Sequence, residues 1–429
     1  MTTALHTIAF KAQSHPKHRF QNLYGLLSSD LLYQSWGQLN RQAAAGIDGV
    51  NIPDYQACLP ENINRLASQL KHKQYRASAI KRVFIPKANG KQRPLGLPTV
   101  DDKVVQQGVS QILQSIWEQD FLRNSYGYRP NKSAHQAVNS LALNLQFSGY
   151  GYIVEADIKG FFDNMDHAWL IKMLEQRIDD KALLGLIKQW LKARVKSPDG
   201  VFSKPVAGTP QGGVISPVLA NIYLHYVIDL WFEKKVKPEL YGRAMLIRYA
   251  DDFVVAFQRK CDAESFYQEL PARLGKFGLA VAPDKTHLKH FSRFHPGRKR
   301  SFQFLGFEFY WSQDVNGKPR LRRRTAPKKL KGAMSEFYQW IKYNRSKPLR
   351  EIMPVLRRKL MGFRNYFGLP SNSRSLSRLY TYVLYSLYKW LNRRSQRRSY
   401  NWSSFKDMLG YFQVEPIRVS KRQTLVDWY

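Results

Sequence analysis

A long apolar run over residues 245–257 is interrupted by the acidic tetrapeptide Tyr249–Asp252. This pattern predicts two short strands joined by a tight turn, with Asp251 and Asp252 at the turn. Like charges a few Å apart repel each other and raise one another's pKa. Paired acids at a hairpin tip therefore indicate a bound divalent metal ion, although a plain solvated turn is the simpler explanation when the pair is taken alone.

A second apolar run, residues 152–156, predicts a strand that delivers Asp157 near its end. Asp157 with Asp251 and Asp252 forms the acid set of a phosphoryl-transfer site that uses two metal ions. Mg²⁺ is the expected ion and Mn²⁺ a possible substitute, because Mg²⁺ takes oxygen ligands and keeps part of its water shell. Since neighbouring residues of an extended chain point to opposite faces, we expect Asp251, rather than Asp252, to pair with Asp157.

The rest of the pattern predicts mixed α/β structure followed by an all-helical, basic module. Residues 1–19 are polar and are expected to be loose, with helices beginning near Phe20. Further elements are expected as follows: a β-hairpin over residues 76–100, a helix over 100–117, a helix over 167–177 with Asp166 as its N-cap, and helices from 330 onward.

The charge balance identifies the kind of partner. The 429 residues include 68 Lys and Arg against 32 Asp and Glu, a formal net charge of +36, which indicates a polyanion. Aromatic residues make up 14% of the chain and offer faces for stacked bases. Two basic runs favour nucleic acid over a membrane surface, and their candidate contacts are Arg322, Arg323, Arg324, Arg393 and Arg394.

Other features exclude several classes of protein. Cys58 and Cys261 are the only cysteines and have no ligand spacing, so a disulfide framework and a zinc site are excluded. The sequence has no secretion leader and no apolar run of about 18 residues, so we expect a cytoplasmic protein without membrane contact. Its length predicts two to four compact units.

Six blocks of residues, in family order, resemble the bacterial group II intron-encoded reverse transcriptases, and the similarity spans about residues 40–370. The blocks are Ile85–Lys87 with Arg93–Gly96, Tyr126–Pro130, Ala156–Asp163, Gly208–Pro217, Tyr249–Asp252 and Phe304–Phe307. A lone Tyr-Ala-Asp-Asp is weak evidence because four-letter strings recur by chance. Six blocks in order are strong evidence.

The resemblance implies a right-hand polymerase fold with fingers, an antiparallel-sheet palm and a helical thumb. It predicts an N-terminal extension and the start of the fingers over residues 1–75, fingers over 76–150, a palm over 151–315, a thumb or maturase domain over 316–400 and a short basic extension over 401–429. The implied activity is RNA-directed DNA polymerisation, with binding of intron RNA, assistance to splicing and a role in intron mobility. RNA template, DNA primer and dNTPs are the implied partners.

The resemblance also implies roles for individual residues. The metal site is assigned to Asp157, Ile158, Asp251 and Asp252. Contacts to the incoming dNTP are assigned to Lys87, Arg93, Phe162, Gln211 and Lys285, with Phe162 as a steric gate below the sugar 2′ position and Phe161 as a core residue. A primer grip is assigned to Phe304, Leu305 and Gly306, where Gly306 permits close backbone contact.

The longest family members carry a zinc-type endonuclease with paired cysteines, and this sequence has neither pair, so we do not expect second-strand cleavage. Two alternatives stay open at this point. One is a free-standing reverse transcriptase that serves phage defence or DNA repair, and the other is an RNA-chaperoning maturase with a silent polymerase. The intact acids, Arg93 and Gln211 argue against the silent form.

Overall fold

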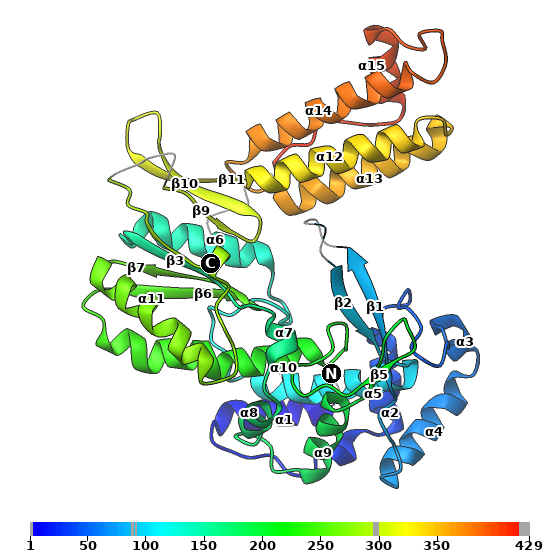
Figure 1. Ribbon diagram of the computed structural model, residues 1–429, viewed down its shortest axis with the longest axis vertical. Helices are drawn as coiled ribbons and strands as arrows, with labels where there is room; N and C mark the ends of the chain where they lie inside the picture. Colours follow the sequence, from blue (N-terminus) through cyan, green and yellow to red (C-terminus); the bar gives the residue numbers. More distant parts are fainter. Residues whose placement is uncertain (1–2, 87–89, 91, 295–299, 420–429) are drawn as a thin grey trace.

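The computed structural model describes residues 3–86, 90, 92–294 and 300–419, and it combines helices with largely antiparallel sheets (Figure 1). The first half contains α1 (Thr3–Ser14), α2 (Ser29–Gln38), α3 (Ile52–Ala57), α4 (Leu59–Lys71), β1 (Ile80–Pro86), β2 (Gln92–Leu97), α5 (Val100–Trp117), α6 (Ala134–Phe147), β3 (Tyr152–Asp157), α7 (Phe161–Asn164), α8 (His167–Leu174), α9 (Lys181–Leu191), β4 (Val195–Lys196) and β5 (Phe202–Ser203).

The second half contains α10 (Ser216–Leu224), two π-helical turns η2 (His225–Asp229) and η3 (Phe232–Val236), β6 (Ala244–Tyr249), β7 (Asp252–Phe257), α11 (Lys260–Gly275), β8 (His287–His290), β9 (Phe302–Phe304), β10 (Phe307–Gln313), β11 (Pro319–Thr325), α12 (Pro327–Asn344), α13 (Leu349–Phe367), α14 (Ser373–Leu391) and α15 (Trp402–Tyr411). The predicted mixture of α/β structure followed by helices is confirmed.

The central sheet has the strand order β6-β7-β3-β8, and every neighbouring pair is antiparallel. Both of its faces are covered. In β7, Phe253 and Val255 belong to the core shared with the N-terminal helices, while Val254 and Ala256 belong to a second core shared with α6 and β10. The strands β3, β6 and β7 are therefore largely apolar, with buried Glu155 in β3 and Arg248 in β6 as exceptions, and the acids Asp157 and Asp252 lie at strand ends.

The N-terminal prediction was wrong, because α1 is a regular helix. Leu5 and Ala12 are buried, and Ile8 packs beside them, so apolar residues at helical spacing face the core. The helix packs against α5, and Arg177 donates from Nη2 to the carbonyl oxygen of Ala12 at 3.1 Å near its end. The polar residues between these positions hid a narrow apolar stripe.

The smaller sheets flank the central one. The sheet β2-β1-β4-β5 contains the predicted hairpin, in which β1 pairs with β2. The sheet β11-β10-β9 leads into the C-terminal helices. The helix predicted over residues 100–117 is α5, and Asp166 caps α8 by accepting from the backbone N–H of Trp169 at 2.8 Å.

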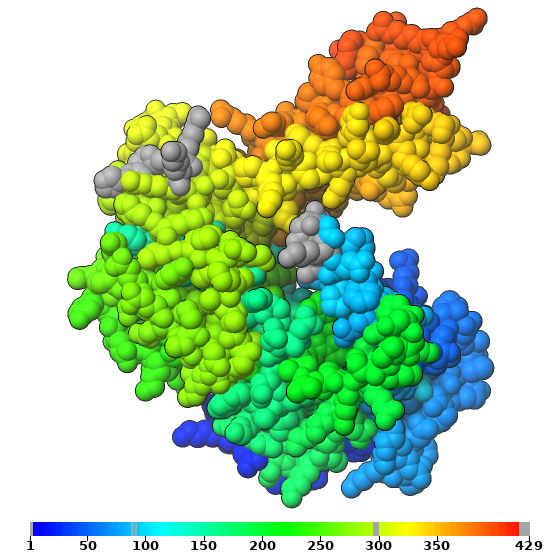
Figure 2. Space-filling view, viewed as in Figure 1, coloured from blue at the N-terminus to red at the C-terminus, as the bar shows by residue number. Residues whose placement is uncertain are grey.

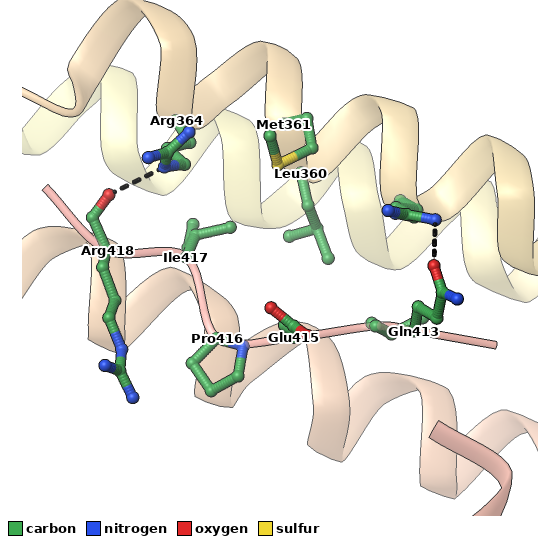
Figure 3. Close-up of a pocket in the computed structure, with 10 residues that line it drawn as sticks. Leu360, Met361, Arg364, Gln413, Glu415, Pro416, Ile417 and Arg418 are labelled. Atoms are coloured by element: carbon green, nitrogen blue, oxygen red, sulfur yellow. Dashed lines mark hydrogen bonds between the residues drawn. The ribbon is translucent and has the colours of Figure 1, made fainter. Parts of the chain in front are cut away.

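The C-terminal helices form a separate core in which α12 packs against α14. Residues 413–418 run along α13 (Figure 3), where Arg357 donates to the Gln413 side chain and Arg364 donates to the carbonyl oxygen of Arg418, both at 2.9 Å. Figure 2 shows a broad hollow between this helical arm and the body that carries β1 and β2. Among the helices of the described residues, none is long and apolar enough to cross a membrane.

Candidate active site

The acidic tetrapeptide forms the predicted hairpin turn between β6 and β7. Tyr249 pairs with Asp252 across the ladder, which leaves Ala250 and Asp251 as the two turn residues. Ala250 has φ +56°, a left-handed conformation that favours glycine. The turn therefore holds its acids in a strained and specific backbone geometry.

Asp157 ends β3 directly beside this turn. In the ladder between β3 and β7, Asp157 is the partner of Asp252. Directly opposed residues of neighbouring strands project to the same face, so the register places Asp252, rather than Asp251, across from Asp157. Asp251 lies in the turn, beyond the strand alternation that we applied, and its pairing with Asp157 on a metal ion stays a prediction.

The acids strongly perturb one another. Burial, then the charges of Asp157 and Asp251, raise the pKa of Asp252 to about 7. Burial also raises the pKa of Asp251, with a further contribution from Asp157. Raised pKa values in a buried cluster of acids are typical of functional sites, because burial and like charges both disfavour the ionised form.

Lys285, which the resemblance assigned to the dNTP, lies at this cluster of acids. Its Nζ donates to the Oδ2 of Asp157 at 2.6 Å, and this contact raises the pKa of the Lys285 ammonium. The backbone N–H of Ala282 donates to the Asp157 carbonyl at 2.8 Å, which ties the Lys285 loop to the end of β3. The lysine side chain itself stays largely exposed.

The donor set fits a hard divalent cation. Among the described residues, no three His, Cys, Asp or Glu side chains form a ready-made metal-binding group. Ionised carboxylates are nevertheless the oxygen donors that Mg²⁺ prefers, and substrate phosphates complete its shell in polymerase sites. Ile158 is different, because its side chain is aliphatic and buried, so only its backbone carbonyl could serve as a ligand.

The loop around Gly208 connects the proposed dNTP residues. The backbone N–H of Thr209 donates to the Phe162 carbonyl at 2.8 Å, and a Cβ on Gly208 would lie 2.6 Å from that same oxygen. At the other end of the loop, the Gln211 carbonyl accepts from the backbone N–H of Gly96 at 2.7 Å. The loop thus joins the turn after β3 to the hairpin strand β2.

The two neighbouring phenylalanines differ as expected. Phe161 is buried and packs against Tyr223, whereas Phe162 is only partly buried. Tyr128, to which sequence reasoning gave no role, contacts Phe162 with a ring separation of 6.5 Å. Burial and then the charge of Asp251 raise the pKa of Tyr128. Its position inside the Tyr126–Pro130 block was the signal available in the sequence.

One described residue of the β1–β2 hairpin, Arg93, is close enough to the acids for its charge to affect them. Arg93 is exposed on β2, and its charge lowers the pKa of Asp251 against the larger effect of burial. Lys87, the other residue predicted on this hairpin, lies outside the described residues.

The proposed primer grip contacts an acid. The backbone N–H of Leu305 bonds to Asp252 and lowers its pKa against the larger opposing effects. Tyr366 of α13 donates to the Leu305 carbonyl at 3.0 Å. Leu305 and Gly306 have φ values of +50° and +77°, and Phe304 is buried in the core. In this turn the backbone of Leu305, not the buried Phe304 ring, is the part that faces the acid Asp252.

The prediction for the arginine run of β11 needs a correction. Arg323 is buried, and its Nη1 donates to the Asn139 side chain at 2.6 Å. Strand alternation turns it away from Arg322 and Arg324. Arg324 remains partly exposed but pairs with Glu308 at 2.6 Å. Arg323 thus joins β11 to α6 and does not belong to an exposed nucleic-acid surface.

The other basic run lies at the end of α14. Arg393 is exposed and lies 5.8 Å from the centre of the Trp390 ring, and Lys342 and Arg345 of the neighbouring segment lie 5.6 and 5.4 Å from it. Arg394 is partly buried and donates to the Lys347 carbonyl. Arg393 therefore keeps a surface position suited to phosphate contacts, whereas Arg394 is partly engaged within the protein.

Comparison with known families gives matches to two separate stretches of the chain. Residues 85–309 match the family described as reverse transcriptase (RNA-dependent DNA polymerase). Residues 330–407 match the group II intron, maturase-specific domain. The first match contains the acids and the Gly208 loop, and the second covers the helices from α12 to most of α15.

Individual relatives agree with these matches. The group II intron-encoded protein LtrA of Lactococcus lactis subsp. cremoris is 28% identical over 96% of this chain and 81% of its own length. Protein YkfC of Escherichia coli K12 is 31% identical over 66% of this chain and 83% of its own length. An uncharacterised 91 kDa protein in the cob intron of Schizosaccharomyces pombe is 33% identical over 62% of this chain and 39% of its own length.

Proposed function

Since the chain belongs to the reverse transcriptases that carry a group II intron maturase domain, we propose that Asp157, Asp251 and Asp252 are the metal-binding acids with which it extends DNA on an RNA template. Its activity is RNA-directed DNA polymerisation, which the reverse transcriptase match supports over a silent polymerase. The maturase match and the intron-encoded relative support a role in intron splicing over a free-standing enzyme. The observation that carries the proposal is the register that brings Asp157 to the acid turn.

The family's right-hand architecture gives each part of the fold a role. We assign the fingers to residues 76–150, the palm to 151–315 and the thumb to 316–400. The central sheet suits a palm, because Asp157, Asp251 and Asp252 lie together where the inner strands β3 and β7 meet the turn. The helical arm suits a thumb, because it faces the β1–β2 hairpin across the hollow in Figure 2.

The three acids supply the carboxylate oxygens that would bind the metal ions. When bound, two Mg²⁺ ions activate the primer 3′-hydroxyl and stabilise the departing pyrophosphate. Asp157 and Asp252 present oxygens on the same face of the sheet, and Asp251 adds oxygens from the turn. Lys285, whose Nζ lies 2.6 Å from Asp157 Oδ2, would place its ammonium near the triphosphate as a proton donor or as a stabiliser of charge.

The fingers and the Gly208 loop form the dNTP pocket in this proposal. Arg93 offers a guanidinium fork for phosphate oxygens. Phe162 lies below the sugar and excludes a 2′-hydroxyl, which favours deoxyribonucleotides. Gln211 contacts the sugar or template nucleotide, and the contact between its carbonyl and Gly96 keeps the loop against the fingers. Leu305 and Gly306 hold the primer end close to Asp252.

The thumb is proposed to hold an RNA duplex as well as the template–primer. Basic helices recognise RNA mainly through its shape and backbone. The family match to the maturase-specific domain supports intron RNA as that partner. Arg393 beside Trp390 is one described contact point that offers both a charge and an aromatic face.

Metal-directed cleavage tests the site directly. Replacing Mg²⁺ by Fe²⁺ with ascorbate and peroxide generates hydroxyl radicals at the bound ion, which cut the backbone nearby. We expect cuts near Asp157 and near residues 251–252, suppressed by excess Mg²⁺ and absent in the Asp157→Asn/Asp251→Asn variant. Cuts at other positions that persist in this variant would remove these acids from the metal site.

A further inference from the structure

A fully buried ion pair lies directly under the acid turn. Arg248 precedes Tyr249–Asp252 in the sequence and is 0% exposed, and its partner Asp229 is also 0% exposed. The contact is bidentate, with Arg248 Nε 2.8 Å from Asp229 Oδ1 and Nη2 2.6 Å from Oδ2. Bidentate pairs fix the orientation of both groups, but burying two charges carries a large desolvation cost. Stabilisation of the fold alone therefore does not account for this buried ion pair.

The remaining nitrogen of the guanidinium contacts the turn itself. Arg248 Nη1 donates to the carbonyl oxygen of Ala250 at 3.1 Å and to the Oδ1 of Asn221 at 3.1 Å. Ala250 is the left-handed residue of the turn. The arginine thus binds the strained peptide that immediately precedes Asp251.

Asn221 of α10 supports the turn indirectly, through Arg248 and through the Gly127 segment that lies against the turn backbone. Asn221 donates from Nδ2 to the Gly127 carbonyl at 2.7 Å. A Cβ on Gly127 would lie only 2.3 Å from the backbone nitrogen of Ala250, so this glycine allows two backbone segments to touch. Arg248 thus bonds to the Ala250 carbonyl, the Gly127 backbone lies against the Ala250 nitrogen, and Asn221 links the two.

The helix that supplies these groups is locally distorted. Asn221 lies in α10, and Asp229 ends the π-helical turn η2 that follows. Such wide turns are rare and are frequently found at functional sites. Burial lowers the pKa of His225, in the same turn, to about 4, so this imidazole is neutral at pH 7 and Arg248 balances the charge of Asp229.

We propose that Arg248, Asp229 and Asn221 are positioning residues that hold the Ala250–Asp251 peptide in the geometry needed for metal binding. The inference rests on the proposed metal-binding role of Asp251 and Asp252. Apolar side chains could fill the same space, as they do throughout the surrounding core. They could not supply the hydrogen bond to the Ala250 carbonyl at a turn where two acids repel each other.

The test replaces the ion pair by apolar residues of similar size. In Arg248→Met/Asp229→Leu no unpaired charge remains, and such replacements are often neutral for folding. The matched control is Arg177→Met/Asp120→Leu, which removes a largely buried pair that contacts residues near α1 instead of the acid turn. Three quantities are measured for each protein: Tm, the binding of Mn²⁺ followed by the loss of its free paramagnetic resonance signal, and kcat and KM for dNTP.

We expect the Arg248/Asp229 variant to keep a Tm close to wild type, to bind Mn²⁺ more weakly and to lose about a hundredfold in kcat, as a displaced catalytic group does. The control should retain both Mn²⁺ binding and kcat. Wild-type Mn²⁺ binding and kcat in the Arg248/Asp229 variant would overturn the proposal and leave the pair as scaffold.

Two further variants keep the result interpretable. Asn221→Ala removes the hydrogen bonds to Gly127 and Arg248 without adding or removing a charge. We expect about a tenfold lower kcat with weaker Mn²⁺ binding, so this variant decides the question if the double variant does not fold. Unchanged values would overturn the proposal. Asp251→Asn tests the underlying site. If Asp251→Asn keeps full activity, the metal assignment fails; if it is inactive while the Arg248/Asp229 variant is unaffected, only the positioning role fails.

Discussion

Replacing Asp252 by Asn should stabilise the metal-free protein while it abolishes DNA synthesis. The carboxylate is held against Asp157 and Asp251, and burial and these charges raise its pKa from 3.8 to about 7. A folded-state pKa above the unfolded value means that the folded protein binds more protons. The stability from Asp252 is therefore fully present below about pH 4 and is lost as the pH rises through about 7.

The size of the effect follows from that shift. About three pKa units correspond to about 4 kcal/mol at most, and solvent access to the half-buried acid reduces this to about 2 kcal/mol. At pH 8 the wild type carries this penalty, and Asp252→Asn does not, so the variant should melt about 2 °C higher. The neutral amide also relieves the repulsion on Asp157 and Asp251.

Thermal melting in EDTA between pH 5 and 8.5 measures the difference. We expect the Tm of Asp252→Asn to exceed that of wild type at pH 8, with a difference that narrows steadily as the pH falls to 5 and that would vanish only below about pH 4. Mg²⁺ should raise the wild-type Tm by mass action but leave the variant nearly unchanged. Asp407→Asn, at an exposed position of α15, is the control and should follow wild type throughout. Parallel curves for Asp252→Asn and wild type would refute the electrostatic reasoning.

Two further predictions follow from the site and the basic surface. Phe162→Ala should raise ribonucleotide incorporation, measured as the ratio of kcat/KM for ribonucleotide over deoxyribonucleotide; an unchanged ratio, with Phe161→Ala changing it instead, would identify the other ring as the gate. Neutralising Arg322 and Arg324 together should lower the slope of log affinity for RNA against log salt by about one to two. Arg323→Gln should instead lower Tm and leave that slope unchanged. A lower slope with an unchanged Tm in Arg323→Gln would place Arg323 on the RNA-binding surface.

Periodicity predicted the elements that carry strong apolar patterns. The strand that ends at Asp157, the acidic hairpin turn and α5 all lie where the sequence indicated. These segments are buried on one or two faces, so their residue types are dictated by the core. The helix α1 was missed because few of its apolar residues, Leu5, Ile8 and Ala12, face the core, and polar residues lie between them.

Charged residues were harder to interpret than apolar ones. The run containing Arg323 was taken as one exposed patch, although strand alternation places this residue in the interior. The pair of Arg248 and Asp229 gave no signal at all, since the two residues are distant in sequence and neither belongs to a recognisable pattern. Their contact depends on the tertiary placement of a π-helical turn, which no local rule predicts.

The most direct test of the central claim is primer extension by Asp251→Asn on an RNA template, measured beside its RNA affinity. The claim predicts that extension is abolished in Mg²⁺ while RNA binding, which rests on distributed basic residues, stays within about twofold of wild type. Asp407→Asn should retain both. Extension by Asp251→Asn at the wild-type rate would contradict the assignment of the acid turn as the metal centre.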